Sequence, residues 1–159
     1  MEPQVLEQVD RQRIVELARD LADIVSITGD EKGVADYLGS EFEKLGMQVE
    51  YQEVEEGRPN VIGTLKGTGG GATLMFCAHM DHFDNPQETV VEDDRIYGRG
   101  LVNMKAAFPC YIDAAAAIQK AGVQLKGDLI ISGVVGEIEK AQIGRFHGKT
   151  YRGDRKSVV

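Results

Sequence analysis

The sequence predicts an α/β fold in which helices lie on both faces of a mixed sheet. Apolar residues recur at helical spacing in three segments, and four further segments have the composition of strands. Along the chain the order is helix, helix, three strands, helix and strand, which favours a layered domain. At 159 residues with 42% hydrophobic content, the chain is long enough for one domain with its own core.

Three segments have the helical pattern. Apolar residues three and four positions apart predict an amphipathic helix over residues 6–25 and a second over residues 31–45. Gly46 is a typical stop signal for the second helix. A third helix is expected to end near Ala121, and because of Pro109 it either starts near Phe108 or has a kink there.

The strands differ in their patterns. MQVEYQEV alternates apolar and polar residues, as a half-exposed strand does. NVIGTLKG predicts the next strand, and the GTGGG that follows favours a hairpin turn. Residues 72–78 are almost continuously apolar, which predicts a central strand buried on both faces. DDRIYGRG predicts a short strand with a glycine loop, and GDLIISGVV another buried strand.

Charge and terminal composition exclude several classes of function. The net charge of −8 and pI near 4.9 argue against nucleic acid or an anionic membrane as a partner. The N-terminal MEPQVLEQVDRQR has neither the basic nor the apolar region of a secretory signal. No apolar run approaches the roughly 20 residues that cross a bilayer. We therefore expect a cytoplasmic protein.

Side chains able to bind metals or protons follow three predicted elements. His79 and Asp81 follow the apolar strand, Asn103 follows a glycine loop, and Glu137 and Glu139 follow GDLIISGVV. Ligands gather beyond the carboxyl ends of strands in open α/β sheets, so these side chains should share one rim. A few N/O ligands, an open position and a carboxylate base are what a zinc hydrolase requires.

Each of these signals has a simpler alternative. A histidine that binds metal usually donates its other N–H to a carboxylate, as His79 could to Asp81, but a lone His-x-Asp string also arises by chance. Glu137 and Glu139 would equally suit a solvated turn. His82 and Asp84 are interpreted as loop residues, Asp84 in a turn before Asn85 and Pro86.

Four segments of the chain occur in the order and spacing of one known family. They are DRQRIVELARDLADIVSITGDEKGVADYLGSEFEKLGMQVE, GRPNVIGTLKGTGGGATLMFCAHMD, RIYGRGLVNMKAA and LIISGVVGEIE. The chain resembles the zinc-dependent amidohydrolases and exopeptidases that include acetylornithine deacetylase, succinyl-diaminopimelate desuccinylase, aminoacylase and glutamate carboxypeptidase. The resemblance implies a zinc-exopeptidase-like catalytic domain. It also implies one or two zinc or cobalt ions, and a small N-acyl amino acid or peptide as substrate.

The resemblance also implies roles for single residues. His79 corresponds to a metal ligand, Asp81 to the carboxylate that orients it, and Glu137 to the general base that activates the attacking water. Two positions depart from the family pattern. Asn103 stands where the family has a bridging aspartate, and its neutral amide oxygen is a poorer bridge between two cations. Ile138 stands where the family has its second glutamate, so Glu139 is the candidate for that ligand.

Family members are much longer and have a second domain for lid closure and dimerisation. The resemblance thus leads us to expect the N-terminal part of the catalytic domain over residues 1–153, with the lid domain absent. The last six residues, DRKSVV, resemble a translated sequencing adapter, so residues 154–159 are expected to be a non-native tail. The complete protein is expected to form a homodimer, and the 159-residue chain alone to be inactive.

Two classes of function remain open. The first is a metal-dependent hydrolase of amide bonds in N-acyl amino acids or small peptides. The second is a non-catalytic homologue in which Asn103 and Ile138 mark a decayed metal site, so that the fold serves binding alone. Histidine and carboxylate ligands in sequence downstream would favour the enzyme.

Overall fold

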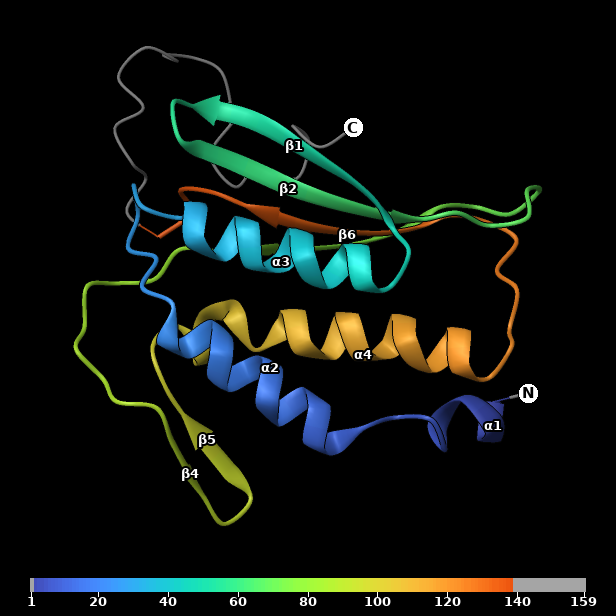
Figure 1. The fold of residues 1–159 in the computed structure, drawn as a ribbon, viewed down its shortest axis with the longest axis horizontal. Helices are drawn as coiled ribbons and strands as arrows, with labels where there is room; N and C mark the ends of the chain where they lie inside the picture. The colour runs from blue at the N-terminus through green and yellow to red at the C-terminus, as the bar shows by residue number, and fades with distance from the viewer. Residues whose placement is uncertain (1, 139–159) are drawn as a thin grey trace.

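The computed structural model describes residues 2–138 of the chain (Figure 1). Glu139, His147 and the tail at 154–159 lie outside the described residues. The helices and strands are, in chain order, α1 (Glu2–Leu6), α2 (Arg11–Asp23), α3 (Lys32–Lys44), β1 (Gln48–Glu55), β2 (Arg58–Leu65), β3 (Leu74–His79), β4 (Val90–Glu92), β5 (Arg95–Tyr97), a short helical turn (Leu101–Lys105), α4 (Ala107–Lys120) and β6 (Leu129–Val134).

The helix predicted over residues 6–25 is shorter in the structure, where α2 runs from Arg11 to Asp23 and Leu6 belongs to the preceding α1. Asp10 has an extended backbone, and its carboxylate accepts a hydrogen bond of 3.0 Å from the Arg13 N–H. This side-chain cap starts α2, because the aspartate satisfies a backbone donor that a continuous helix would have used. The helix predicted over residues 31–45 and the one predicted to end near Ala121 are confirmed as α3 and α4. No helix within residues 2–138 is long and apolar enough to cross a membrane.

The main sheet is mixed, as predicted, with the order β1-β2-β6-β3. β1 and β2 form an antiparallel hairpin, β6 is antiparallel to β2, and β3 is parallel to β6. The hairpin expected from β2 into β3 through GTGGG is therefore wrong, because β6 lies between the two strands. Among the described strands, β3 is at the sheet edge instead of the predicted centre, and Leu74 is 55% exposed. A short apolar run is compatible with a central strand, but also with an edge strand that is covered by one layer of helices.

Within residues 2–138, α3 and α4 pack against the same face of this sheet (Figure 1). Phe76 of β3 stacks on Tyr111 of α4 with ring centroids 4.6 Å apart. Gly133 of β6 lies against Leu38 of α3, on the same face as Phe76 in the register of the strands. The opposite face includes Cys77 and the buried Ser132. The register places Met75, Ile130 and Val134 on that face as well.

Close packing between α3 and β2 gives a stability prediction. An added Cβ at Gly63 of β2 would lie 2.6 Å from the fully buried Phe42 ring. Replacement Gly63→Ala is therefore expected to lower the free energy of unfolding by about 2 kcal/mol, since overpacking forces side chains from their preferred rotamers. Urea unfolding measures the loss. The double variant Gly63→Ala/Phe42→Leu should lose less than the sum of its two single variants, and a purely additive loss would contradict this origin.

Candidate active site

His79 is the last residue of β3, and Asp81 follows it two residues later. Both side chains are buried, with 5% and 0% exposed. The Nδ1 atom of His79 lies 3.0 Å from the Asp81 carbonyl oxygen and 3.3 Å from its Oδ1 atom. Both oxygens are acceptors, so Nδ1 carries the proton and donates it toward Asp81. In its neutral form the ring then presents an unprotonated Nε2 atom on its other side.

The Nε2 atom of His79 faces Asn103 and Glu137. Nε2 lies 3.1 Å from the Oδ1 atom of Asn103 and 3.6 Å from the Oε2 atom of Glu137. Burial lowers the pKa of His79, but hydrogen bonds with Asp81 and Asn103 and the charges of Asp81 and Glu137 outweigh it and raise the pKa above its ordinary value. The surroundings of Nε2 thus favour a positive charge at this point, either a proton or a metal ion.

Asp81 is held from three sides. Its carboxylate accepts hydrogen bonds from the Thr28 hydroxyl at 2.6 Å and from the backbone N–H groups of Glu137 and Ile138 at 3.1 and 2.9 Å. Burial raises the pKa of Asp81, but the hydrogen bonds from His79, Thr28 and these amides lower it to about 2. The carboxylate is ionised at neutral pH, and it joins the histidine to the loop that holds Glu137.

Residues 135–138 form a loop in which every backbone N–H group donates a hydrogen bond to a side-chain oxygen. The Val135 N–H donates to Asn60 at 3.0 Å, and the Gly136 N–H donates to Glu31 at 3.2 Å. Sequence reasoning missed Glu31, Asn60 and Thr28. The signal that could have found Asn60 is an amide residue at the edge of an apolar segment, because a buried polar group must find a partner.

Asn103 lies on the helical turn Leu101–Lys105, which follows Gly100 in a left-handed backbone conformation (φ +70°). The turn is anchored by Lys105, whose fully buried Nζ atom donates to the carbonyl oxygens of Leu21 and Ile24 at 2.9 and 2.7 Å. Burial, with the charge of Arg99, lowers the pKa of Lys105 to about 7. These carbonyls lie at the C-terminal end of α2, where the helix dipole favours a cation.

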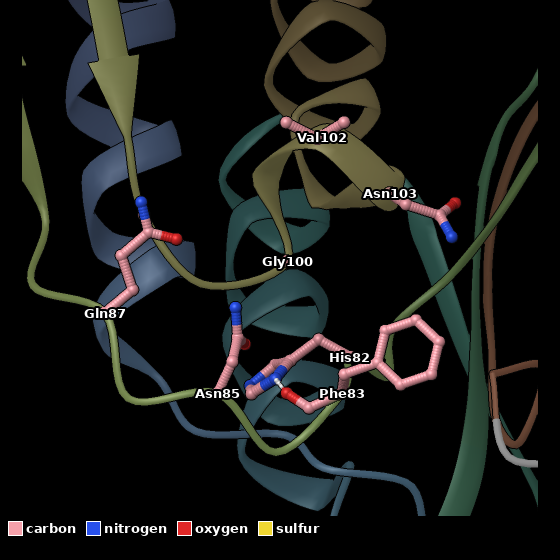
Figure 2. A pocket seen from close by; sticks show the side chains of 8 residues that line it. His82, Phe83, Asn85, Gln87, Gly100, Val102 and Asn103 are labelled. Atoms are coloured by element: carbon pink, nitrogen blue, oxygen red, sulfur yellow. Dashed lines mark hydrogen bonds between the residues drawn. The ribbon is translucent and has the colours of Figure 1, made fainter.

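His82, for which the sequence favoured a place in a loop or a cleft wall, is buried, with 3% exposed. Its Nε2 atom accepts from the Ser26 N–H at 3.1 Å, and its Nδ1 atom donates to the Phe83 carbonyl oxygen (Figure 2). Both ring nitrogens are therefore used in structural hydrogen bonds, and His82 has no free nitrogen for a metal. Asp84 is exposed, as expected for a turn residue.

Two cavities meet at Asn103. One, of about 200 Å³, is lined by Cys77, Ala78, His79, Asn103, Met104, Val134 and Glu137. The other, of about 190 Å³, is lined by His82, Phe83, Asn85, Gln87, Gly98, Gly100, Val102 and Asn103 (Figure 2). Among the described residues that line the second cavity, only His82 can carry a charge, and burial lowers the pKa of His82.

The residues around Nε2 of His79 suit part of a metal coordination shell. An imidazole nitrogen and a carboxylate are common zinc donors, the amide oxygen of Asn103 is a weaker one, and Asp81 lies behind the histidine as an outer carboxylate. Within residues 2–138, however, no group of three His, Cys, Asp or Glu side chains could hold an ion. The structure brings together His79, Asp81, Asn103 and Glu137, which are four of the five predicted site residues. The fifth, Glu139, is outside the described part.

Comparisons with known proteins show which family the chain is similar to. The model of peptidase family M20/M25/M40 matches residues 75–144. An N-formyl-4-amino-5-aminomethyl-2-methylpyrimidine deformylase from Bacillus subtilis is 29% identical over 67% of this chain and 28% of its own length. A peptidase M20 domain-containing protein from Schizosaccharomyces pombe is 32% identical over 78% of this chain and 32% of its own. A succinyl-diaminopimelate desuccinylase from Gluconobacter oxydans is 33% identical over 75% and 34%.

Solved structures agree with these sequence matches. A tripeptidase from Staphylococcus aureus superposes with a TM-score of 0.72 and 25% identity, over 82% of this chain and 38% of that one. A dinuclear metal-binding peptidase of family M20 from Bacillus subtilis gives a TM-score of 0.63 at 17% identity, over 82% and 36%. The chain spans about a third of the length of the curated relatives named above. The predicted resemblance and the mixed α/β fold are confirmed, because residues 75–144 match peptidase family M20/M25/M40 and the curated relatives and solved structures named above share this part of the chain.

Proposed function

We propose that the protein is a metal-dependent hydrolase of amide bonds in N-acyl amino acids or small peptides. One observation supports this most directly: the Nε2 atom of His79 lies 3.1 Å from Oδ1 of Asn103 and 3.6 Å from a carboxylate oxygen of Glu137. When the proton of the neutral ring is on Nδ1, three acceptor atoms face one another, which favours a cation between them. The family match supports the same proposal, because the similar proteins include a desuccinylase and a tripeptidase.

In this proposal, His79 holds the ion through Nε2 and Asn103 holds it through Oδ1. Glu139 is proposed as a further ligand on the resemblance alone. A bound zinc or cobalt ion would supply Lewis acidity, which acidifies water and polarises a carbonyl group. Asp81 keeps the proton of His79 on Nδ1, so that Nε2 stays free. The neutral amide of Asn103 makes one firmly held ion more favourable than two that share a bridge.

Glu137 is proposed as the general base. Its side chain is 51% exposed, so water can reach it, while its backbone is fixed by Asp81. The carboxylate would accept a proton from the attacking water and return it to the leaving nitrogen. The cavity beyond Asn103 would receive a neutral part of the substrate, because Asn85 and Gln87 offer amides there and charged side chains are absent from its described lining.

The test uses the complete product of the gene that encodes this chain, assayed with added zinc or cobalt on N-acetyl and N-succinyl amino acids and dipeptides. Glu137→Gln should lower kcat by about 10²–10⁴-fold with little change in KM. His79→Ala should weaken cobalt binding, followed by the visible absorption of the ion, by at least about tenfold. Glu88→Gln, the same chemical change on an exposed glutamate, should leave both unchanged.

The result that would overturn the proposal is equally definite. If the metal-supplemented protein hydrolyses none of these substrates, or if Glu137→Gln is as active as the wild type, the site is not catalytic. Asn103 gives specific support to the alternative of a binding protein with a decayed metal site, and ligand binding without turnover would favour it. Faster hydrolysis of N-succinyl than N-acetyl substrates would contradict the proposed preference for neutral groups.

A further inference from the structure

The segment between α2 and α3, residues 26–31, touches both halves of the candidate site. We propose that Thr28 and Glu31 act from this segment as positioning residues, which fix where Glu137 lies relative to His79. The catalytic consequence rests on the proposed function. The structural part concerns hydrogen bonds that can be measured in the chain itself, without metal or substrate.

The segment is bound first to the residues that follow β3. The Ser26 hydroxyl donates to the Met80 carbonyl oxygen at 2.7 Å. The Ser26 backbone exchanges two hydrogen bonds with His82: its N–H donates to the ring at 3.1 Å and its carbonyl accepts from the His82 N–H at 2.9 Å. These contacts are buried, so the segment and the end of β3 form one rigid unit.

Glu31 connects the same segment to the loop that holds Glu137. Its fully buried Oε1 atom accepts from the Gly136 N–H at 3.2 Å and from the Gly29 N–H at 3.1 Å. Arg58 fixes the carboxylate plane through two bonds, Nε to Oε2 at 2.8 Å and Nη2 to Oε1 at 2.6 Å. A fork-to-fork pair of this kind allows little rotation, so the position of Gly136 follows that of Glu31.

Thr28 acts on the next two residues of the loop through Asp81. Its hydroxyl donates to Oδ2 of Asp81, the atom that also accepts from the Ile138 N–H, while Oδ1 accepts from the Glu137 N–H. Without the hydroxyl, the carboxylate loses one of the bonds that set its rotamer. The loop amides that depend on it would then move, and a shift of about 1 Å in a catalytic group can cost about 10²-fold in rate.

The first experiment measures amide hydrogen exchange by NMR in the 159-residue chain. Thr28→Val should speed exchange of the Glu137 and Ile138 amides by about tenfold, the equivalent of one lost hydrogen bond. Glu31→Gln should do the same for the Gly136 amide. Amides in the middle of α4 should exchange as before. Thr28→Ser, which keeps the hydroxyl, should restore protection, and Asp30→Asn should change nothing, because Asp30 is exposed in the same segment.

The second experiment measures hydrolysis by the same variants of the complete gene product. Thr28→Val should lower kcat by about 10–100-fold with KM and cobalt affinity unchanged, and Thr28→Ser should recover most of it. A purely structural role would lower the melting temperature and leave kcat per folded molecule intact.

The outcomes are separable. Unchanged exchange at residues 136–138 overturns the proposal, and so does exchange that rises equally in Asp30→Asn. Altered exchange with normal kcat overturns its catalytic part. If Glu31→Gln does not fold, the Thr28 pair alone decides the question. If even the wild-type protein has no hydrolase activity, only the proposed function fails. The exchange experiment still tests whether Thr28 and Glu31 position residues 136–138.

Discussion

Replacement of Asp81 by alanine is expected to lower the free energy of unfolding by about 3 kcal/mol, the size typical of removing one partner from a buried charged network. The carboxylate is fully buried and accepts from Thr28 and from the backbone of Glu137 and Ile138. Its loss leaves these donors unsatisfied and frees the ring of His79 to rotate. Urea unfolding, followed by circular dichroism, measures the change.

Asp84→Ala is the matched control, because it removes a carboxylate from an exposed position in the same connection. It should change the free energy of unfolding by less than about 0.5 kcal/mol. Asp81→Asn should fall between the two, since the amide retains one acceptor oxygen for the loop. Asp81→Ala should also weaken cobalt binding about 10–100-fold, the range for lost outer carboxylates. Equal stability of Asp81→Ala and wild type would show that the network contributes nothing.

Replacement Arg58→Met is expected to cost about 3–5 kcal/mol, because it leaves the carboxylate of Glu31 buried without its cation. Glu31 is 0% exposed and Arg58 7%, and the hydrogen bond and charge of Glu31 raise the pKa of Arg58 above its ordinary value. Glu55 is the second partner of Arg58, at 2.9 Å, and is partly exposed. We expect the buried partner to account for most of the loss, as exposed ion pairs contribute little.

A double-mutant cycle tests that origin. Glu31→Gln removes the buried negative charge, so the double variant Glu31→Gln/Arg58→Met should be more stable than Arg58→Met alone. The matched cycle with Glu55→Gln should be close to additive. If the Glu31 cycle is additive as well, the cost of Arg58→Met comes from lost packing of its long side chain, and the charge argument is wrong.

Much of the site was predictable because its residues follow strands. His79 ends β3 and Glu137 follows β6; because these strands are parallel, their carboxyl ends bring the two residues together at one edge. The helices α3 and α4 were predictable from their spacing of apolar residues. Asp81 was expected beside His79 from the His-x-Asp string, and the structure has it there. The roles of these residues in catalysis stay proposals.

The parts that escaped sequence reasoning depend on contacts between distant residues. Nothing near Glu31 indicates that Arg58 and Gly136 will meet it, since its position between turn residues and α3 equally suits an exposed helix start. The place of β3 at the sheet edge depends on β6 entering beside β2, which local patterns do not encode. The break at Asp10 was missed because helical periodicity continues across it, while the cap acts through one side chain.

The parallel pairing of β3 with β6 also affects how the molecule folds. Leu74 pairs with Leu129, so the intervening chain, including α4, must close into a loop before these strands can meet. The β1–β2 hairpin, by contrast, joins neighbours in sequence and can form early. We infer that His79 and Glu137 come together late on the folding pathway. Substitutions at these two residues should then change the rate of unfolding more than the rate of folding.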